Sequence, residues 1–103
     1  MSYYTQAFAP AYGQGVTVVP GVASAVQALP NNSSAVELTN LSSTISCSIR
    51  FGETASLTAT LGGDYVLLPG MKSVITKQRG YQFFAYIGSG AAGSLHVIPG
   101  EGL

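Results

Sequence analysis

Residues 88–93 read GSGAAG, which matches the G-x-G-x-x-G pattern of dinucleotide-binding loops. That chemistry requires a strand before the loop, a helix after it that holds the pyrophosphate at its N-terminus, and an acidic residue about 20 positions further on. The preceding QFFAYI (82–87) suits a strand, but the apolar, proline-broken run that follows does not suit a helix. We therefore expect this loop to join two antiparallel strands, with glycines supplying positive φ angles, and to hold no nucleotide.

The remaining groups that could do chemistry are one histidine, one cysteine and four carboxylates. His96 lies in SLHVIP on the strand face of Ser94 and Ile98, which is typical of a surface or interface histidine. Cys47 stands among apolar residues, so its pKa should be raised and its thiol unreactive. The four carboxylates show no spacing typical of an acid–base pair or a metal site: Glu37, Glu53, Asp64 and Glu101. The sequence therefore predicts no enzyme, no metal site and no cofactor.

The composition is poor in charge. Charged side chains make up 8% of the 103 residues, and the formal net charge is 0, whereas an ordinary soluble domain is about 25% charged. A nucleic-acid-binding protein would show a basic surface, and the apolar runs are shorter than the ~20 residues of a membrane-spanning helix. Because a neutral, charge-poor surface tends to self-associate, we predict an assembly subunit with no nucleic-acid or membrane partner.

The N-terminal region differs from the rest of the chain. Residues 1–36 carry no charged side chain, and four aromatics fall within the first twelve positions: Tyr3, Tyr4, Phe8 and Tyr12. Prolines and glycines oppose a helix here, and the segment lacks the polar composition of a flexible tail. We interpret residues 1–22 as an extended arm whose four aromatics bind a partner. The alternative is an edge strand whose aromatics fold onto the domain's own core.

The sequence pattern of residues 23–103 predicts a β-sandwich domain. Short segments with alternating apolar and polar residues recur at spacings of about 8–12 residues between Gly/Pro turns, which is typical of antiparallel sandwiches and barrels. The expected strands are 24–29, 35–40, 44–51, 56–61, 65–69, 71–78, 82–89 and 93–100. The fold class predicted is all-β: a small antiparallel β-sandwich or jelly-roll-like barrel with an extended N-terminal arm.

Alternation also predicts which side chains face the core. In TISCSIRF the inward side chains should be Ile45, Cys47, Ile49 and Phe51. The outward side chains of the same strand should be Thr44, Ser46, Ser48 and Arg50. In SLTATL the expected inward side chains are Leu57, Ala59 and Leu61.

Three of the four cationic residues lie within eight positions: Lys72, Lys77 and Arg79. Lysines protect the free edge of a sheet from unwanted pairing, so we interpret this strand as an edge strand. The alternative is contact with an acidic partner. Tyr81, Phe83 and Phe84 follow directly, which leaves open a platform for carbohydrate or single-stranded nucleic acid, although the absence of tryptophan and the neutral composition weigh against both.

The runs AVELTN, SIRFG, LLPGMKSVIT and LHVIPGEGL together resemble small all-β virion proteins of tailed bacteriophage heads. The resemblance covers about residues 24–103 and rests on strand order and the V-x-P-G-E-G run. It implies a non-catalytic capsid decoration, or cement, protein on the capsid exterior of a virion, made in the cytoplasm of a bacterial host. The partners implied are the major capsid protein and the chain itself, as a homo-oligomer (dimer or trimer).

The resemblance assigns no binding residues, and two other roles remain open. One is a head–tail connector or tail component present in few copies. The other is a carbohydrate-binding β-sandwich module that would use Tyr65, Tyr81 or Tyr86.

Overall fold

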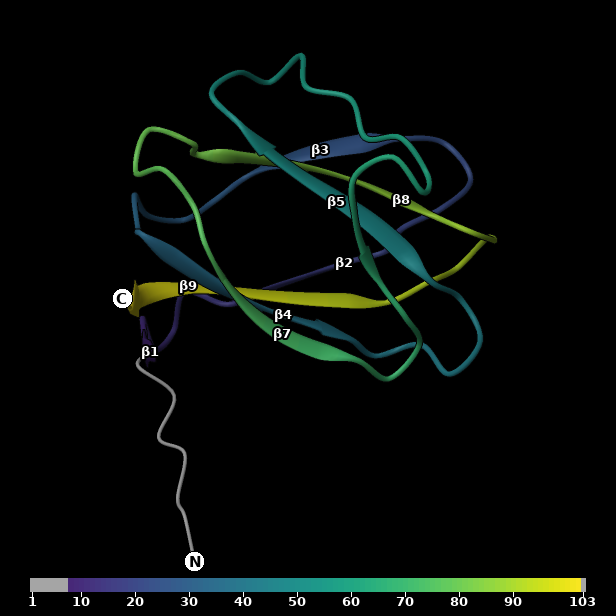
Figure 1. Ribbon diagram of the computed structural model, residues 1–103, viewed down its shortest axis with the longest axis horizontal. Helices are drawn as coiled ribbons and strands as arrows, with labels where there is room; N and C mark the ends of the chain where they lie inside the picture. Colours follow the sequence, from purple (N-terminus) through teal and green to yellow (C-terminus); the bar gives the residue numbers. More distant parts are fainter. Residues whose placement is uncertain (1–7, 103) are drawn as a thin grey trace, which may run out of the picture.

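A computed structural model describes residues 8–102, and these residues form strands, turns and loops (Figure 1). The described part of the chain includes no helix that could cross a membrane. Nine strands run through residues 8–102: β1 (Phe8–Pro10), β2 (Val16–Val18), β3 (Ala25–Ala28), β4 (Ala35–Asn40), β5 (Cys47–Gly52), β6 (Tyr65–Leu67), β7 (Lys72–Thr76), β8 (Phe83–Gly88) and β9 (Leu95–Gly102).

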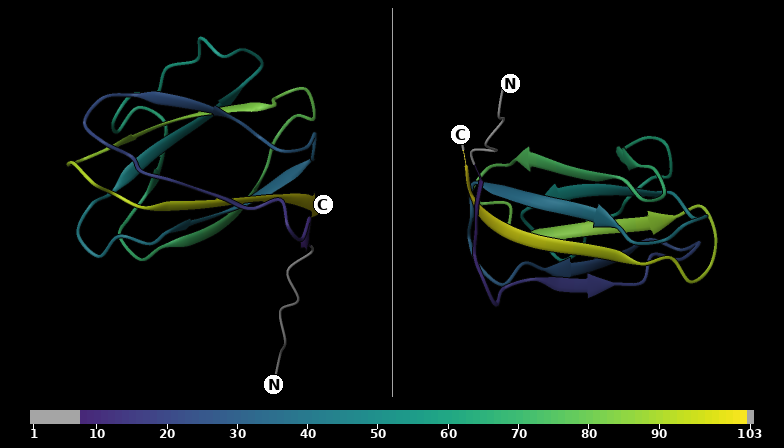
Figure 2. Two further views of the ribbon diagram at one scale, coloured as in Figure 1. Left: turned by 180° about the vertical axis from the view of Figure 1, so that it is seen from behind. Right: turned by 90° about the horizontal axis from the view of Figure 1, so that it is seen from below.

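The strands form two antiparallel sheets. Sheet 1 has the order β1-β9-β4-β7, and β2 pairs with a further stretch of β9, while sheet 2 has the order β3-β8-β5-β6. Figure 1 shows the two layers nearly edge-on, with β3, β5 and β8 above β4, β7 and β9, and the right panel of Figure 2 shows the strands of sheet 1 side by side. The predicted all-β, two-layer antiparallel fold is confirmed.

Apolar side chains from paired positions fill the space between the sheets. Leu38 of β4 is in register with Val97 of β9, and both are fully buried. In sheet 2 the buried ring of Phe84 lies 5.5 Å from the ring of Tyr86 and 6.3 Å from that of Phe51. Burial of each such side chain contributes about 1.5–3 kcal/mol, so this layer is the main source of stability.

A buried amide connects the two sheets at the end of β4. The Nδ2 group of Asn40, which is 2% exposed, donates to the carbonyl oxygens of Ile45 (2.9 Å) and Leu67 (3.0 Å). Its Oδ1 accepts the backbone N–H of Ser42 at 3.0 Å. Since Asn40 belongs to sheet 1 and Leu67 to sheet 2, this side chain fixes the separation of the sheets while satisfying its own polar atoms.

The prediction of a strand at 56–61 is wrong. This stretch belongs to a loop between β5 and β6 that arches beyond the end of β5 and returns past it (Figure 1). Its backbone N–H groups bind side chains instead of a neighbouring strand: Ala59 donates to Ser24 Oγ at 2.8 Å, and Gly62 donates to Ser48 Oγ at 3.0 Å. The loop is therefore held against the outer face of sheet 2.

This loop also explains two errors in the predicted side-chain faces. Ser48 was expected to face solvent, yet it is fully buried because the loop covers it. Of the side chains expected to point inward from 56–61, Ala59 is buried but Leu61 is 49% exposed. In β5 itself, Cys47 and Ile49 point into the core as predicted.

The boundary predicted at residue 22 does not separate an arm from a domain in the described part of the chain. Phe8–Pro10 pairs with Gly100–Gly102, and Val16–Val18 pairs with Leu95–Val97. Both stretches satisfy their backbone hydrogen bonds along β9, which makes them strands of sheet 1. For these residues the alternative of an edge strand is correct; residues 1–7 lie outside the described residues.

The GSGAAG loop has a different role from the expected one. It crosses from β8 in sheet 2 to β9 in sheet 1, so it is not a hairpin turn. The positive φ (63°) belongs to Ala92, whereas Gly88 and Gly93 lie close to the Pro20 segment. The N–H of Gly93 donates to Pro20 O at 3.0 Å, and a Cβ there would lie 3.0 Å from the same oxygen. These glycines permit close backbone approach.

Candidate partner-binding surface

The two residues closest to nucleophile and base chemistry belong to different sheets: Cys47 to β5 of sheet 2 and His96 to β9 of sheet 1. Cys47 packs in the core between the sheets, while His96 alternates with the buried Leu95 and Val97 and so points away from the core. Burial raises the pKa of the Cys47 thiol to about 11, which removes the thiolate at neutral pH. The geometry therefore provides no cysteine–histidine pair.

The carboxylates are separated, and two of them are engaged by neighbouring residues. Asp64 forms an ion pair with Arg50 at 3.3 Å and accepts the backbone N–H of Thr60 at 2.7 Å, which fastens the end of the β5–β6 loop. Among the described residues no group of three or more His, Cys, Asp or Glu side chains is placed to hold a metal ion.

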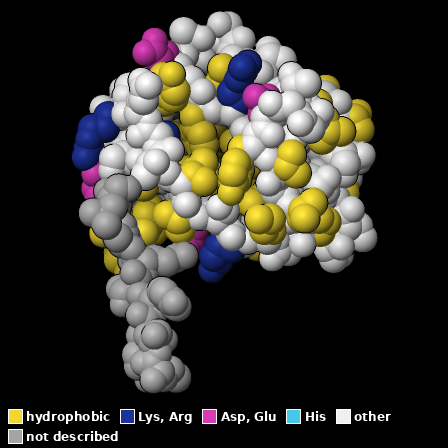
Figure 3. Space-filling view, in the orientation of Figure 1, with side chains coloured by type: hydrophobic (Ala, Val, Ile, Leu, Met, Phe, Trp, Pro, Cys, Tyr) yellow, Lys and Arg dark blue, Asp and Glu magenta, His cyan; other side chains and the backbone are white. Residues whose placement is uncertain are grey.

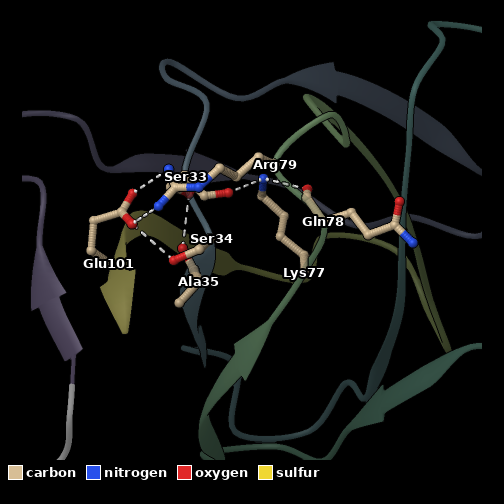
Figure 4. A network of polar contacts seen from close by, with 7 residues as sticks. All are labelled: Ser33, Ser34, Ala35, Lys77, Gln78, Arg79 and Glu101. Atoms are coloured by element: carbon tan, nitrogen blue, oxygen red, sulfur yellow. Dashed lines mark hydrogen bonds and ion pairs between the residues drawn. The ribbon is translucent and has the colours of Figure 1, made fainter. Parts of the chain in front are cut away.

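Glu101 of β9 connects three segments that are distant in sequence (Figure 4). Its carboxylate forms an ion pair with Arg79, which follows β7, and accepts a hydrogen bond from Ser34 Oγ at 2.9 Å. These hydrogen bonds, first that from Arg79 and then that from Ser34, lower the pKa of Glu101. The cluster holds the end of β9 against the turn that precedes β4.

Two of the three cations for which contact with an acidic partner was the alternative, Lys77 and Arg79, are engaged within the chain. Lys77 Nζ donates to Ser33 O at 2.6 Å and to Gln78 O at 3.2 Å (Figure 4), and burial, followed by the nearby Arg79 charge, lowers its pKa. Lys72 is exposed on β7, which is an edge strand of sheet 1. The prediction of an edge strand carrying lysine is confirmed.

The four aromatics predicted to bind a partner have different positions. Tyr3 and Tyr4 lie outside the described residues. Phe8 is half-buried in β1, and its ring lies so close to Gly100 that a Cβ there would meet ring carbon Cε1 at 2.7 Å. Tyr12, in the turn after β1, is 85% exposed. Phe8 thus contacts its own chain, while Tyr12 presents its ring to solvent.

The aromatic residues considered for carbohydrate or base stacking do not form one platform. Phe84 is fully buried and Tyr86 is 8% exposed, because both contribute to the core. Tyr65 lies on β6, and its Oη is 2.5 Å from Ser73 Oγ of β7. Stacking on a flat ligand requires free ring faces, and the two core rings have none.

A surface that sequence reasoning missed lies over β6 and the turn between β6 and β7. Four exposed apolar side chains, which we call the β6–β7 surface, define it: Leu41 (56% exposed), Val66 (40%), Leu68 (57%) and Met71 (39%). Figure 3 shows hydrophobic side chains gathered over this part of the molecule. Exposed apolar patches of this kind are typical of interaction sites.

Backbone hydrogen bonds bring Leu41, Leu68 and Met71 close together. The N–H of Met71 donates to Leu68 O at 3.0 Å, and the N–H of Asn40, next to Leu41, donates to Met71 O at 2.8 Å. Val66 precedes the buried Leu67 on β6. A sequence signal exists in YVLLP, since three consecutive apolar residues in a strand must turn at least one of them away from the core.

Comparisons with known proteins give no relative for this chain. No family model matches the sequence, no curated protein matches it, and no solved structure matches the fold.

Proposed function

We propose that this protein is a non-catalytic structural subunit of a virion, specifically a decoration protein that binds the outside of a tailed-bacteriophage head. The observation that supports this most is the β6–β7 surface, where Leu41, Leu68 and Met71 are exposed on a chain with 8% charged residues. A compact domain with an apolar patch and few charges suits permanent burial against a partner rather than free diffusion.

The partner we propose is the major capsid protein, and the action is to reinforce contacts between its subunits. Each copy would bury a small apolar area, and many copies on one shell would add their effects. If the decoration protein also forms a small oligomer, several weak contacts engage together and the overall attachment becomes much stronger than any single one. The proposed action requires no chemical step.

Quantitative mass spectrometry of purified virions tests the proposal by comparing the copy number of this chain with that of the major capsid protein. Hundreds of copies per particle are expected for a protein that covers the shell. A handful of copies would instead support the head–tail connector or tail role. Absence from the particle would overturn the proposal.

A matched pair of variants tests the surface itself. Leu68→Asp places a charge on the β6–β7 surface, whereas Val22→Asp places one on a residue that is 71% exposed outside that surface. Attachment to undecorated heads should weaken for Leu68→Asp and remain unchanged for Val22→Asp. Equal attachment of both variants would show that the capsid contact lies elsewhere.

A further inference from the structure

Met71, the residue of the β6–β7 surface that directly precedes β7, and the start of β1 lie toward diagonally opposite corners of sheet 1. Phe8 is in register with Gly102, and Gly100 is in register with Ala35, which pairs with Thr76. When these strand registers are extended across the sheet from β1 through β9 and β4 to β7, Phe8 lies at the same height along the strands as position 78. Met71 lies seven positions away, near the other end of the sheet. Figure 1 shows β1 at the left and the turn between β6 and β7 at the right.

The separation can be derived from strand geometry. Seven positions along a strand span about 23 Å, and the three spacings from β1 to β7 add about 14 Å across the sheet. The straight line from Phe8 to Met71 is therefore roughly 27 Å. Tyr3 and Tyr4 precede Phe8 by five and four residues, so their Cα atoms lie at most about 17 Å and 14 Å from it. These bounds leave the Cα atoms of Tyr3 and Tyr4 at least about 10 Å and 13 Å from that of Met71, so either tyrosine could touch the β6–β7 surface of its own chain only if the segment ran fully extended straight across the sheet. Contact with a second copy carries no such constraint.

The N-terminal residues match this surface chemically. Tyr3, Tyr4 and Thr5 carry no charge and favour extended structure, and the four side chains of the surface are also uncharged. Contact between them would bury aromatic area without removing a charged side chain from water. A tyrosine ring can cover Leu68 or Met71 while its hydroxyl group stays in contact with water at the edge of the surface.

We propose that residues 1–7 of one copy bind the β6–β7 surface of a second copy, with Tyr3 and Tyr4 covering Leu41, Leu68 and Met71. Each copy then donates its N-terminal segment at one corner and receives another at the opposite corner. A contact between two different surfaces of identical chains closes into a ring or continues as a chain. This self-association needs no capsid, so it can be tested separately from the proposed function.

Disulfide trapping tests the contact directly. Two purified proteins, Tyr4→Cys and Leu68→Cys, are mixed under mild oxidation; Cys47 is buried in both and stays unreactive. The expected product is a disulfide-linked dimer containing one copy of each variant. The matched control is Tyr4→Cys mixed with Val22→Cys, which should give no such dimer. Equal crosslinking in both mixtures, or none in either, would overturn the proposal.

Sedimentation equilibrium supplies the second measurement, on the full chain without capsid. Deletion of residues 2–7 and the substitution Leu68→Asp should each raise the dissociation constant of self-association by about tenfold or more, with unchanged circular dichroism. Val22→Asp should leave it unchanged. A full chain that remains monomeric, or a deletion without effect, would refute self-association; if that deletion still weakened capsid attachment, the segment would bind the capsid protein instead.

Discussion

Tyr65 Oη lies 2.5 Å from Ser73 Oγ, and this hydrogen bond joins β6, an edge strand of sheet 2, to β7, an edge strand of sheet 1. The two strands belong to different layers, so the contact closes one side of the sandwich. It lies next to the β6–β7 surface, and it therefore helps to hold that surface in shape.

Removal of either partner of this hydrogen bond should destabilise the protein modestly. Tyr65→Phe and Ser73→Ala are each expected to lower the free energy of unfolding by about 0.5–1.5 kcal/mol. Because both changes remove the same contact, the double variant should lose less than the sum of the single losses. Urea denaturation of the four proteins measures this, and strictly additive losses would show that the two hydroxyl groups act independently.

Asn40→Ala should destabilise the protein more than either of these substitutions. The substitution removes the Nδ2 donor that satisfies the carbonyl oxygens of Ile45 and Leu67, and it leaves these groups buried without that partner. We expect a loss of about 1–3 kcal/mol in the free energy of unfolding. Asn32→Ala, at an exposed position of the preceding turn, is the matched control and should change stability by less than about 0.5 kcal/mol. A similar loss in both would argue against the role assigned to Asn40.

The Arg79–Glu101 ion pair should make stability depend on pH in the acidic range. The pKa of Glu101 is lowered in the folded protein from its ordinary value of 4.5. A lowered carboxyl pKa contributes stability that is fully present above the unfolded pKa and is lost as the pH falls through the folded pKa. The melting temperature of the wild-type protein should therefore fall as the pH drops below about 4.5, and Glu101→Gln should reduce this dependence.

The matched control for this titration is Glu53→Gln, which removes an exposed carboxylate outside the Glu101 cluster. It should retain the acid-induced fall attributed to Glu101. Because the Arg79–Glu101 pair is exposed, added salt should weaken its contribution. A Glu101→Gln variant that follows the wild-type curve at every pH would contradict the assignment.

Neighbouring substitutions in the loop between β8 and β9 should act in opposite directions. Ala92 has a φ of 63°, a region that glycine tolerates better, so Ala92→Gly should stabilise the protein by about 0.5–1 kcal/mol. Gly93→Ala places a Cβ 3.0 Å from Pro20 O and should cost about 1–3 kcal/mol. Thermal unfolding of the two variants measures this, and a stabilising Gly93→Ala would show that the Pro20 segment can move away.

Much of the fold could be predicted because burial imposes alternation on a strand. Cys47 and Ile49 face the core as predicted, because apolar and polar residues alternate along their strand. Val36 and Leu38, which alternate in the same way along β4, are fully buried. Alternation does not, however, say what the backbone pairs with. The pattern in SLTATL is the same whether its N–H groups meet a neighbouring strand or side chains such as the Ser24 hydroxyl group and the Asp64 carboxylate, so the sequence could not distinguish a strand from a covering loop.

The binding surface could be predicted less well than the fold. Exposure of Leu68 and Met71 depends on where two sheets end, which is a property of the assembled sandwich and not of any short run of residues. The prediction of a boundary between arm and domain at residue 22 was wrong for a similar reason. Phe8–Pro10 and Val16–Val18 are too short to show a period, and they are strands because β9 offers them partners. Tyr3 and Tyr4 lie outside the described residues, so their role in binding a partner stays a prediction.

The position of β9 in sheet 1 determines when that sheet can assemble. β1, β2 and β4 all pair with β9, which begins at Leu95, after every one of its partners has been synthesised. In sheet 2, β3 and β5 likewise wait for β8. A nascent chain that stops before Leu95 therefore carries strands with unpaired edges, which are prone to aggregation. Translation must proceed into the last strand before the sandwich can close, and folding is coupled to completion of β9.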